Sequence, residues 1–189
     1  HKAAEQGNAS AQNNLGVMYS DGEGVEQDFK KAVELYTKAA EQGDVKAQFN
    51  LARMYATGRG VEKDEAEAFQ WFQKAAEQGH VKAQFNLGIR YATGRGVEKD
   101  EAEAVSWYRK AAEQGNAYAQ FNLAGMYAEG RGIEKDEAEA VKWYRKAAEQ
   151  GNAKAQCNLG ISYATGRGVE KDEAEAFQWF QKAAEQGNT

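Results

Sequence analysis

The sequence predicts an all-α protein, an α-solenoid of antiparallel helix pairs. One observation behind this is a repeat, since the string Ala-Ala-Glu-Gln-Gly begins at residues 3, 39, 75, 111, 147 and 183, always 36 residues apart. A second observation is that each repeat holds two segments whose apolar residues recur at helical spacing, separated by glycine-containing turns. A single helix pair cannot cover its own apolar side, so neighbouring pairs are expected to stack into a solenoid.

We expect a single solenoid over residues 1–189. Residues 1–7 would be the end of a partial repeat, and residues 188–189 would start the next one. Because no polar cap is recognisable at either end, we expect a segment of a longer array whose ends stack head to tail on another copy. The full repeats are 8–43, 44–79, 80–115, 116–151 and 152–187.

The first helix of the repeat 44–79 is predicted over Val45–Thr57, where Ala47, Leu51 and Tyr55 share one face with Gln48 and Ala52. The residue before this helix is a good N-cap at Asp44, Asn116 and Asn152, whereas His80 is a weak one. Residues 58–63 are predicted to form a loop, because two glycines flank one arginine there.

The second helix is predicted to begin at Asp64, which stands three residues before Glu67 as in a capping box. Gly79 is expected to end it in the left-handed conformation. Small residues of the first helices should let aromatic residues of the second helices approach. The small ones are Gly16, Ala52, Gly88, Ala124 and Gly160, and the aromatic ones are Tyr36, Phe72, Tyr108, Tyr144 and Phe180. Trp71, Trp107, Trp143 and Trp179 are assigned to the core between helices.

Composition excludes several classes of protein. The chain has no proline, which excludes a collagen, and no apolar run long enough for a membrane-spanning helix. Its net charge of −5 disfavours nucleic acid as a partner, because phosphate contacts need clustered Lys and Arg. The one cysteine, Cys157, excludes an internal disulfide and a zinc site with several cysteines.

The chain resembles the Sel-one-like repeat (SLR) family, relatives of the tetratricopeptide repeats. The resemblance rests on the run from Ala47 to Tyr55, the Gly58-Arg59-Gly60-Val61 loop, and the Ala75-Ala76 pair before Gly79, which recur through all five units. Tetratricopeptide repeats run at 34 residues, often with a proline, so the SLR assignment is preferred. The resemblance implies a right-handed superhelix whose first helices line a concave face, and an adaptor that holds other proteins in complexes.

Three columns on the first helices vary between repeats and lie opposite the core face. By resemblance to tetratricopeptide-like arrays, these columns would face a ligand, and an apolar strip flanked by cations suits a peptide. The predicted partner-binding residues are Lys46, Phe49, Arg53, Lys82, Phe85, Ile89, Tyr118, Phe121, Lys154, Cys157 and Ile161.

Two alternatives stay open in this surface. The phenylalanine column could be the binding strip, or it could pack between successive first helices as core. The asparagine that every repeat carries could clamp the backbone of a partner, or it could bridge neighbouring helices. In the four repeats with a predicted site, these asparagines are Asn50, Asn86, Asn122 and Asn158.

Catalytic and cofactor chemistry finds little support in the repeats. His80 is the only histidine inside the array and has no partners for a catalytic triad. The Gly-Arg-Gly loops lack a phosphate-binding spacing, and the acidic loop around Asp21 fails the calcium-loop pattern. We therefore predict no enzyme, no cofactor and no metal.

The leading functional hypothesis is a scaffold that binds a protein or peptide in the concave groove. Its alternatives are a structural spacer or an engineered near-consensus array without a native partner, with an enzyme third. Neither nucleic acid nor membrane insertion is expected. Family resemblance is compatible with a bacterial periplasmic or secreted protein, and the residues themselves assign no compartment.

Overall fold

The structure is a computed structural model that describes residue 4 and residues 7–187. Within these residues the chain forms ten α-helices and no strand, and every helix is 13 residues long. First helices of the repeats are α2 (Ala9–Asp21), α4 (Val45–Thr57), α6 (Val81–Thr93), α8 (Ala117–Glu129) and α10 (Ala153–Thr165). Second helices are α3 (Phe29–Glu41), α5 (Glu65–Glu77), α7 (Glu101–Glu113), α9 (Glu137–Glu149) and α11 (Glu173–Glu185).

The first helices begin and end as predicted. The carboxylate of Asp44 accepts a hydrogen bond from the Ala47 amide at 2.9 Å, and Gly58 ends α4 with φ at 69°. His80 also caps its helix, because Nδ1 accepts from the Ala83 amide at 3.2 Å, a longer bond than the one at Asp44. A neutral imidazole nitrogen supplies the same acceptor as an asparagine oxygen.

The second helices form only half of the predicted capping box. Asp64 accepts from the backbone amides of Ala66 and Glu67, both at 2.9 Å. The Asp64 amide is bonded instead to the Tyr55 carbonyl at 3.1 Å, so Glu67 has no amide to reach back to. At the other end, Gly79 follows α5 with φ at 86°, as predicted.

Alanines and aromatic rings fill the core between the helices. Ala47 and Leu51 of α4 and Phe72 of α5 are at most 2 % exposed. The predicted pairing of small residues with rings is present, since a Cβ built on Gly16 would lie 2.7 Å from the Tyr36 ring. Trp107, Trp143 and Trp179 are buried as expected, and Trp71 is half-buried.

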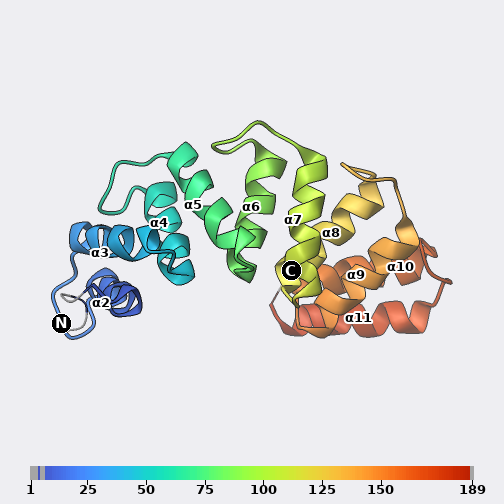
Figure 1. Ribbon diagram of the computed structural model, residues 1–189. Helices are drawn as coiled ribbons and strands as arrows, with labels where there is room; N and C mark the ends of the chain where they lie inside the picture. The colour runs from blue at the N-terminus through green and yellow to red at the C-terminus, as the bar shows by residue number, and fades with distance from the viewer. Residues whose placement is uncertain (1–3, 5–6, 188–189) are drawn as a thin grey trace. The chain divides into compact units, whose positions relative to one another are not determined.

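The chain divides into two compact units, His1–Lys99 and Asp100–Thr189. Within each unit, successive helices lie antiparallel and pack on their neighbours in the sequence (Figure 1). The predicted all-α solenoid with a period of 36 residues is therefore confirmed. Among the described residues, the helices are too short and too polar for any to cross a membrane.

The ends of the array are only partly described. Apart from Ala4 and Gly7, the expected partial repeat at 1–7 and the start at 188–189 lie outside the described residues. On α11, Phe180 is 39 % exposed, whereas the equivalent Phe72 is 2 % exposed. Head-to-tail stacking on this face remains a prediction.

Candidate functional site

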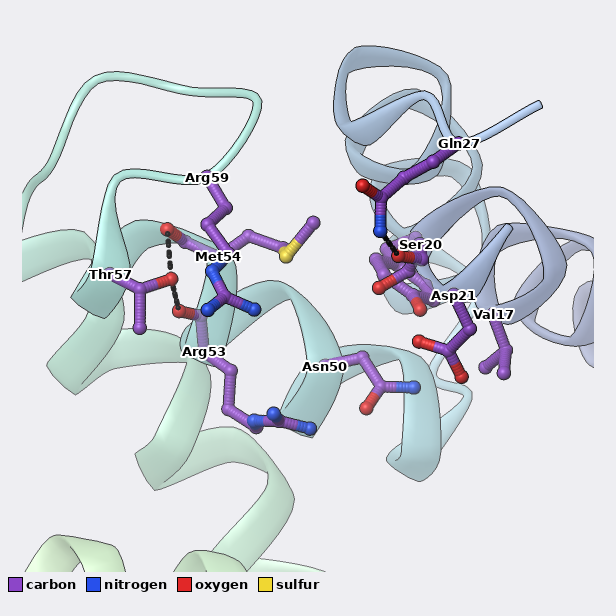
Figure 2. A pocket seen from close by; sticks show the side chains of 10 residues that line it. Val17, Ser20, Asp21, Gln27, Asn50, Arg53, Met54, Thr57 and Arg59 are labelled. Atoms are coloured by element: carbon purple, nitrogen blue, oxygen red, sulfur yellow. Dashed lines mark hydrogen bonds between the residues drawn. The ribbon is translucent and has the colours of Figure 1, made fainter. Parts of the chain in front are cut away.

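Three pockets recur at one position of the repeat, each between the first helices of adjacent repeats. We name them the α2–α4, α4–α6 and α8–α10 pockets, and Figure 2 shows the α2–α4 pocket from close by. The α2–α4 pocket is lined by Val17, Ser20, Asp21, Gln27, Tyr36, Asn50, Arg53, Met54, Thr57 and Arg59. The α4–α6 pocket is lined by Phe49, Arg53, Ala56, Thr57, Glu65, Phe72, Asn86, Ile89, Arg90 and Arg95. The α8–α10 pocket is lined by Ala128, Lys135, Glu137, Ala140, Tyr144, Asn158, Ile161, Ser162 and Arg167.

The three pockets share one plan. An aromatic residue of a second helix forms the floor, and the asparagine of the next first helix stands beside it. An arginine from the following Gly-Arg-Gly loop completes the wall. In chain order, the aromatic residues are Tyr36, Phe72 and Tyr144, the asparagines are Asn50, Asn86 and Asn158, and the loop arginines are Arg59, Arg95 and Arg167.

Several predicted site residues come together at these pockets. Phe49, Arg53, Asn86 and Ile89 line the α4–α6 pocket, although they belong to two repeats. In the α2–α4 pocket, Asn50 and Arg53 extend from α4 towards the side occupied by α2 (Figure 2). Asn158 and Ile161 line the α8–α10 pocket. The side chains of Lys46, Lys82, Tyr118 and Lys154 are exposed outside the three linings.

The phenylalanine column is half-buried. Its rings are therefore partly packed as core and partly accessible to a partner. The Phe49 ring packs edge-on against Phe72, with ring centroids 5.8 Å apart, and stacks on His80 at 4.5 Å. Phe121 packs on Tyr144 in a tilted arrangement, with ring centroids 5.9 Å apart. Phe85 and Cys157 are half-buried as well. One side of the column is therefore packed on the repeat, and the other side stays accessible.

The asparagines have intramolecular partners that depend on the neighbouring repeat. Asn50 donates to Oδ1 of Asn13 at 3.0 Å, which joins α4 to α2. Asn158 is hydrogen-bonded to the Tyr144 hydroxyl and partly offsets the burial that raises the pKa of this tyrosine; Asn122 is bonded to Tyr108 in the same way. Where the second helix carries Phe72 instead, Asn86 donates to the Lys82 carbonyl at 2.7 Å. The bonds of Asn50, Asn122 and Asn158 fit the bridging alternative, whereas the bond of Asn86 stays within α6. The clamp remains a prediction.

Sequence reasoning missed Arg90, which is the most buried charged group of the α4–α6 pocket. Its side chain is 7 % exposed, and Nη1 donates to the Glu65 carboxylate at 2.9 Å and to the Glu65 carbonyl at 3.1 Å. The guanidinium also lies 4.9 Å from the Phe72 ring centroid. A signal was present, because the other repeats carry Met or Ser at this position. Those residues are Met18, Met54, Met126 and Ser162.

The charged groups around Arg90 shift one another's pKa. A hydrogen bond from Lys63 lowers the pKa of Glu65 below its ordinary value, and Arg90 lowers it further. Burial lowers the pKa of Arg90, while Glu65 opposes this effect. Both groups are therefore charged at neutral pH and form an ion pair at the edge of the pocket. The loop arginines were also missed, because the sequence assigns them only to a turn.

The described residues give little indication of metal or thiol chemistry. In the described part of the chain, no group of three His, Cys, Asp or Glu residues is placed to hold a metal ion. Cys157 is a free, half-buried cysteine.

The match to a family model decides the identity of the repeats. The Sel1 repeat model matches residues 9–44, 45–80, 81–116, 117–152 and 153–188. The chain belongs to the Sel1-repeat family. Sel1-repeat proteins are generally protein-interaction scaffolds and are typically not enzymes.

Solved Sel1-type structures resemble the chain closely. A protective antigen of uropathogenic Escherichia coli strains with an SLR fold is 45% identical over 98% of this chain, with a TM-score of 0.97. The chain spans 40% of the length of that antigen. A Sel1 repeat protein from Oxalobacter formigenes is 42% identical, with 97% of this chain and 76% of that one covered and a TM-score of 0.93.

A third structure resembles the chain less closely. Helicobacter pylori cysteine rich protein B is 29% identical, with 68% of this chain and 92% of that one covered and a TM-score of 0.54. Among curated protein sequences, none matches the chain.

Proposed function

We propose that the chain is a scaffold that binds a peptide or an extended protein segment in a groove along its first helices. The observation that carries the proposal is that Phe49, Arg53, Asn86 and Ile89, which come from two repeats, line one pocket. A ligand that enters this pocket would contact neighbouring repeats at once. Aromatic and arginine side chains beside a pocket are the groups that most often anchor protein interfaces.

The second helices are less suited to binding a partner than the first helices are. Their tryptophan rings are covered by the chain itself, because a lysine lies over each ring. Lys74 is 4.0 Å from the Trp71 centroid, and Lys110 is 3.8 Å from that of Trp107. An aromatic ring that already has an ammonium group on its face offers less to a partner.

The proposal is tested by affinity selection of a random peptide library on the full chain, followed by mapping with one selected peptide. We expect that peptide to slow amide hydrogen exchange in α4 and α6. Lys82→Glu should weaken binding, whereas Lys38→Glu, on the second helix α3, should leave it unchanged. Protection confined to second helices would contradict the proposed groove.

Phe85→Asp tests the aromatic column directly. Because Phe85 is half-buried, circular dichroism must first show that the helices of this variant are retained. Loss of peptide binding with the helices intact is the expected result. If neither library nor mapping reveals a bound peptide, the scaffold proposal fails and a structural spacer becomes the better description.

A further inference from the structure

We propose that the α4–α6 pocket binds a carboxylate of the partner, which Arg53 and Arg95 hold between them. This inference rests on the proposed function and names the chemistry that the pocket would select. The inference predicts that the partner carries an acidic group. The surface of the first helices alone does not predict this.

In two other repeats, the loop arginine contacts the preceding second helix. In the repeat 116–151, Arg131 is 3.4 Å from Oε1 of Glu101, the first residue of α7. In the repeat 44–79, the Arg59 guanidinium lies 5.7 Å from the ring centroid of Phe29, the first residue of α3. The loop arginine thus rests on the first residue of the preceding second helix.

Among the residues that the structure describes, Arg95 does not have this partner. The residue at the corresponding position is Glu65, which is bound by Arg90 at 2.9 Å and by Lys63 at 2.9 Å. Within the described residues, neither Arg95 nor Arg53 forms an ion pair. Two guanidinium groups therefore line one pocket without a carboxylate of their own.

Apolar side chains line the pocket beside these two charges. The cavity is about 360 Å³, and the rings of Phe49 and Phe72 and the side chain of Ile89 form its apolar walls. A charge-assisted hydrogen bond is stronger beside such walls than in open water. Arginine presents a planar fork that matches a carboxylate, so two arginines suit one acidic group.

The charge balance of the pocket favours an acidic group. Arg53, Arg90 and Arg95 face a single acid, Glu65, although the whole chain carries a net charge of −5. The local excess of positive charge attracts an anion.

The test uses two random synthetic peptide libraries, one with free and one with amidated C-termini, selected on the full chain. We expect Asp or Glu to be enriched at one position in both libraries, or a free C-terminus to be preferred. The first result assigns the carboxylate to a side chain, and the second assigns it to the chain end. Replacing the acid of a selected peptide by its amide should weaken binding roughly tenfold.

Three variants separate the pocket from general electrostatics. Arg53→Gln and Arg95→Gln change exposed residues and should each abolish the acid preference, with circular dichroism unchanged. Arg131→Gln is the matched control, because Arg131 occupies the same loop position but is already paired with Glu101 and Glu129. It should leave the preference intact.

Different experimental results would overturn the scaffold proposal and the carboxylate inference. If no peptide binds in either library, the proposed function falls and this inference falls with it. If peptides bind without preference for an acid, or if the preference survives in both pocket variants, only the carboxylate inference is overturned. A phosphoserine peptide that binds more tightly than its glutamate counterpart also overturns it.

Discussion

Gln78 donates a hydrogen bond from Nε2 to Oε1 of the buried Gln48 at 2.8 Å. Gln48 in turn donates from its own Nε2 to the carbonyl of Ala40 at 3.2 Å. One buried amide therefore joins the end of α3, the start of α4 and the end of α5. The same glutamine pair occurs at Gln42 and Gln12, at Gln150 and Gln120, and at Gln186 and Gln156.

Gln120→Leu is expected to destabilise the chain. The substitution leaves the Ala112 carbonyl without the donor that lies 3.0 Å away, and it leaves Gln150 without its acceptor at 2.7 Å. Ala112 keeps the Gly115 amide at 3.0 Å, so the cost is that of the lost hydrogen bonds, about 0.5–1.5 kcal/mol each. The midpoint of urea unfolding should fall. Gln178→Leu, an exposed position on α11, is the control and should change it little. Equal midpoints would show that the buried amide is dispensable.

Gly96→Ala is expected to cost more stability than Gly115→Ala. Both glycines have positive φ, at 72° and 90°, so each alanine adopts a strained backbone. A Cβ on Gly96 would also overlap the carbonyl of Glu65, whereas one on Gly115 meets nothing within 4 Å. The difference should be about 1–3 kcal/mol, the cost of overpacking. Thermal unfolding of the two variants measures this difference. Similar losses of stability would contradict the close approach of Gly96 to the Glu65 carbonyl.

Local features of this fold could be predicted because they depend on residues within one turn. The helix over Val45–Thr57, the cap at Asp44 and the stop at Gly79 follow from neighbouring positions and recur in every repeat. The glycine loop was predicted for its backbone freedom alone. Its contact with the preceding repeat, as at Gly96 and Glu65, needs the packed structure.

The candidate site was predicted only in part, for the same physical reason. Repeat comparison found Phe49, Arg53 and Ile89, because their columns vary while the core face stays constant. It could not find the ion pair of Arg90 with Glu65, since the two residues are 25 positions apart and belong to different helices. A charged residue in a column that otherwise holds methionine or serine was the available signal.

Arg90→Met should be tolerated better than Glu65→Gln. Methionine stands at the equivalent Met54, and after this change Glu65 keeps Lys63 at 2.9 Å. Glu65→Gln instead leaves the buried guanidinium of Arg90 without its carboxylate. The second variant should lose roughly 1–3 kcal/mol more, less than for a fully buried pair because Glu65 is partly exposed. Urea unfolding of both variants checks the order, and the reverse order would contradict it.

His80 should make stability depend on pH. Burial lowers the pKa of His80 below its ordinary value of 6.5, and Lys82 and Lys46 lower it further. The unfolded chain therefore takes up this proton at a higher pH than the folded chain does. The contribution of His80 is complete above about pH 6.5 and declines as the pH falls from there towards the folded-state pKa. Protonation also removes the Nδ1 acceptor that caps α6.

His80→Asn isolates this effect, because asparagine caps α8 at Asn116 with a bond of 2.9 Å from Ala119 and does not titrate. The measurement is the melting temperature of both proteins between about pH 7.5 and about pH 5. Acidic residues titrate alike in the two chains, so the difference between the curves belongs to His80. We expect the wild-type curve to fall more steeply on acidification. Parallel curves would mean that the ring remains neutral, or that its protonation is not linked to folding.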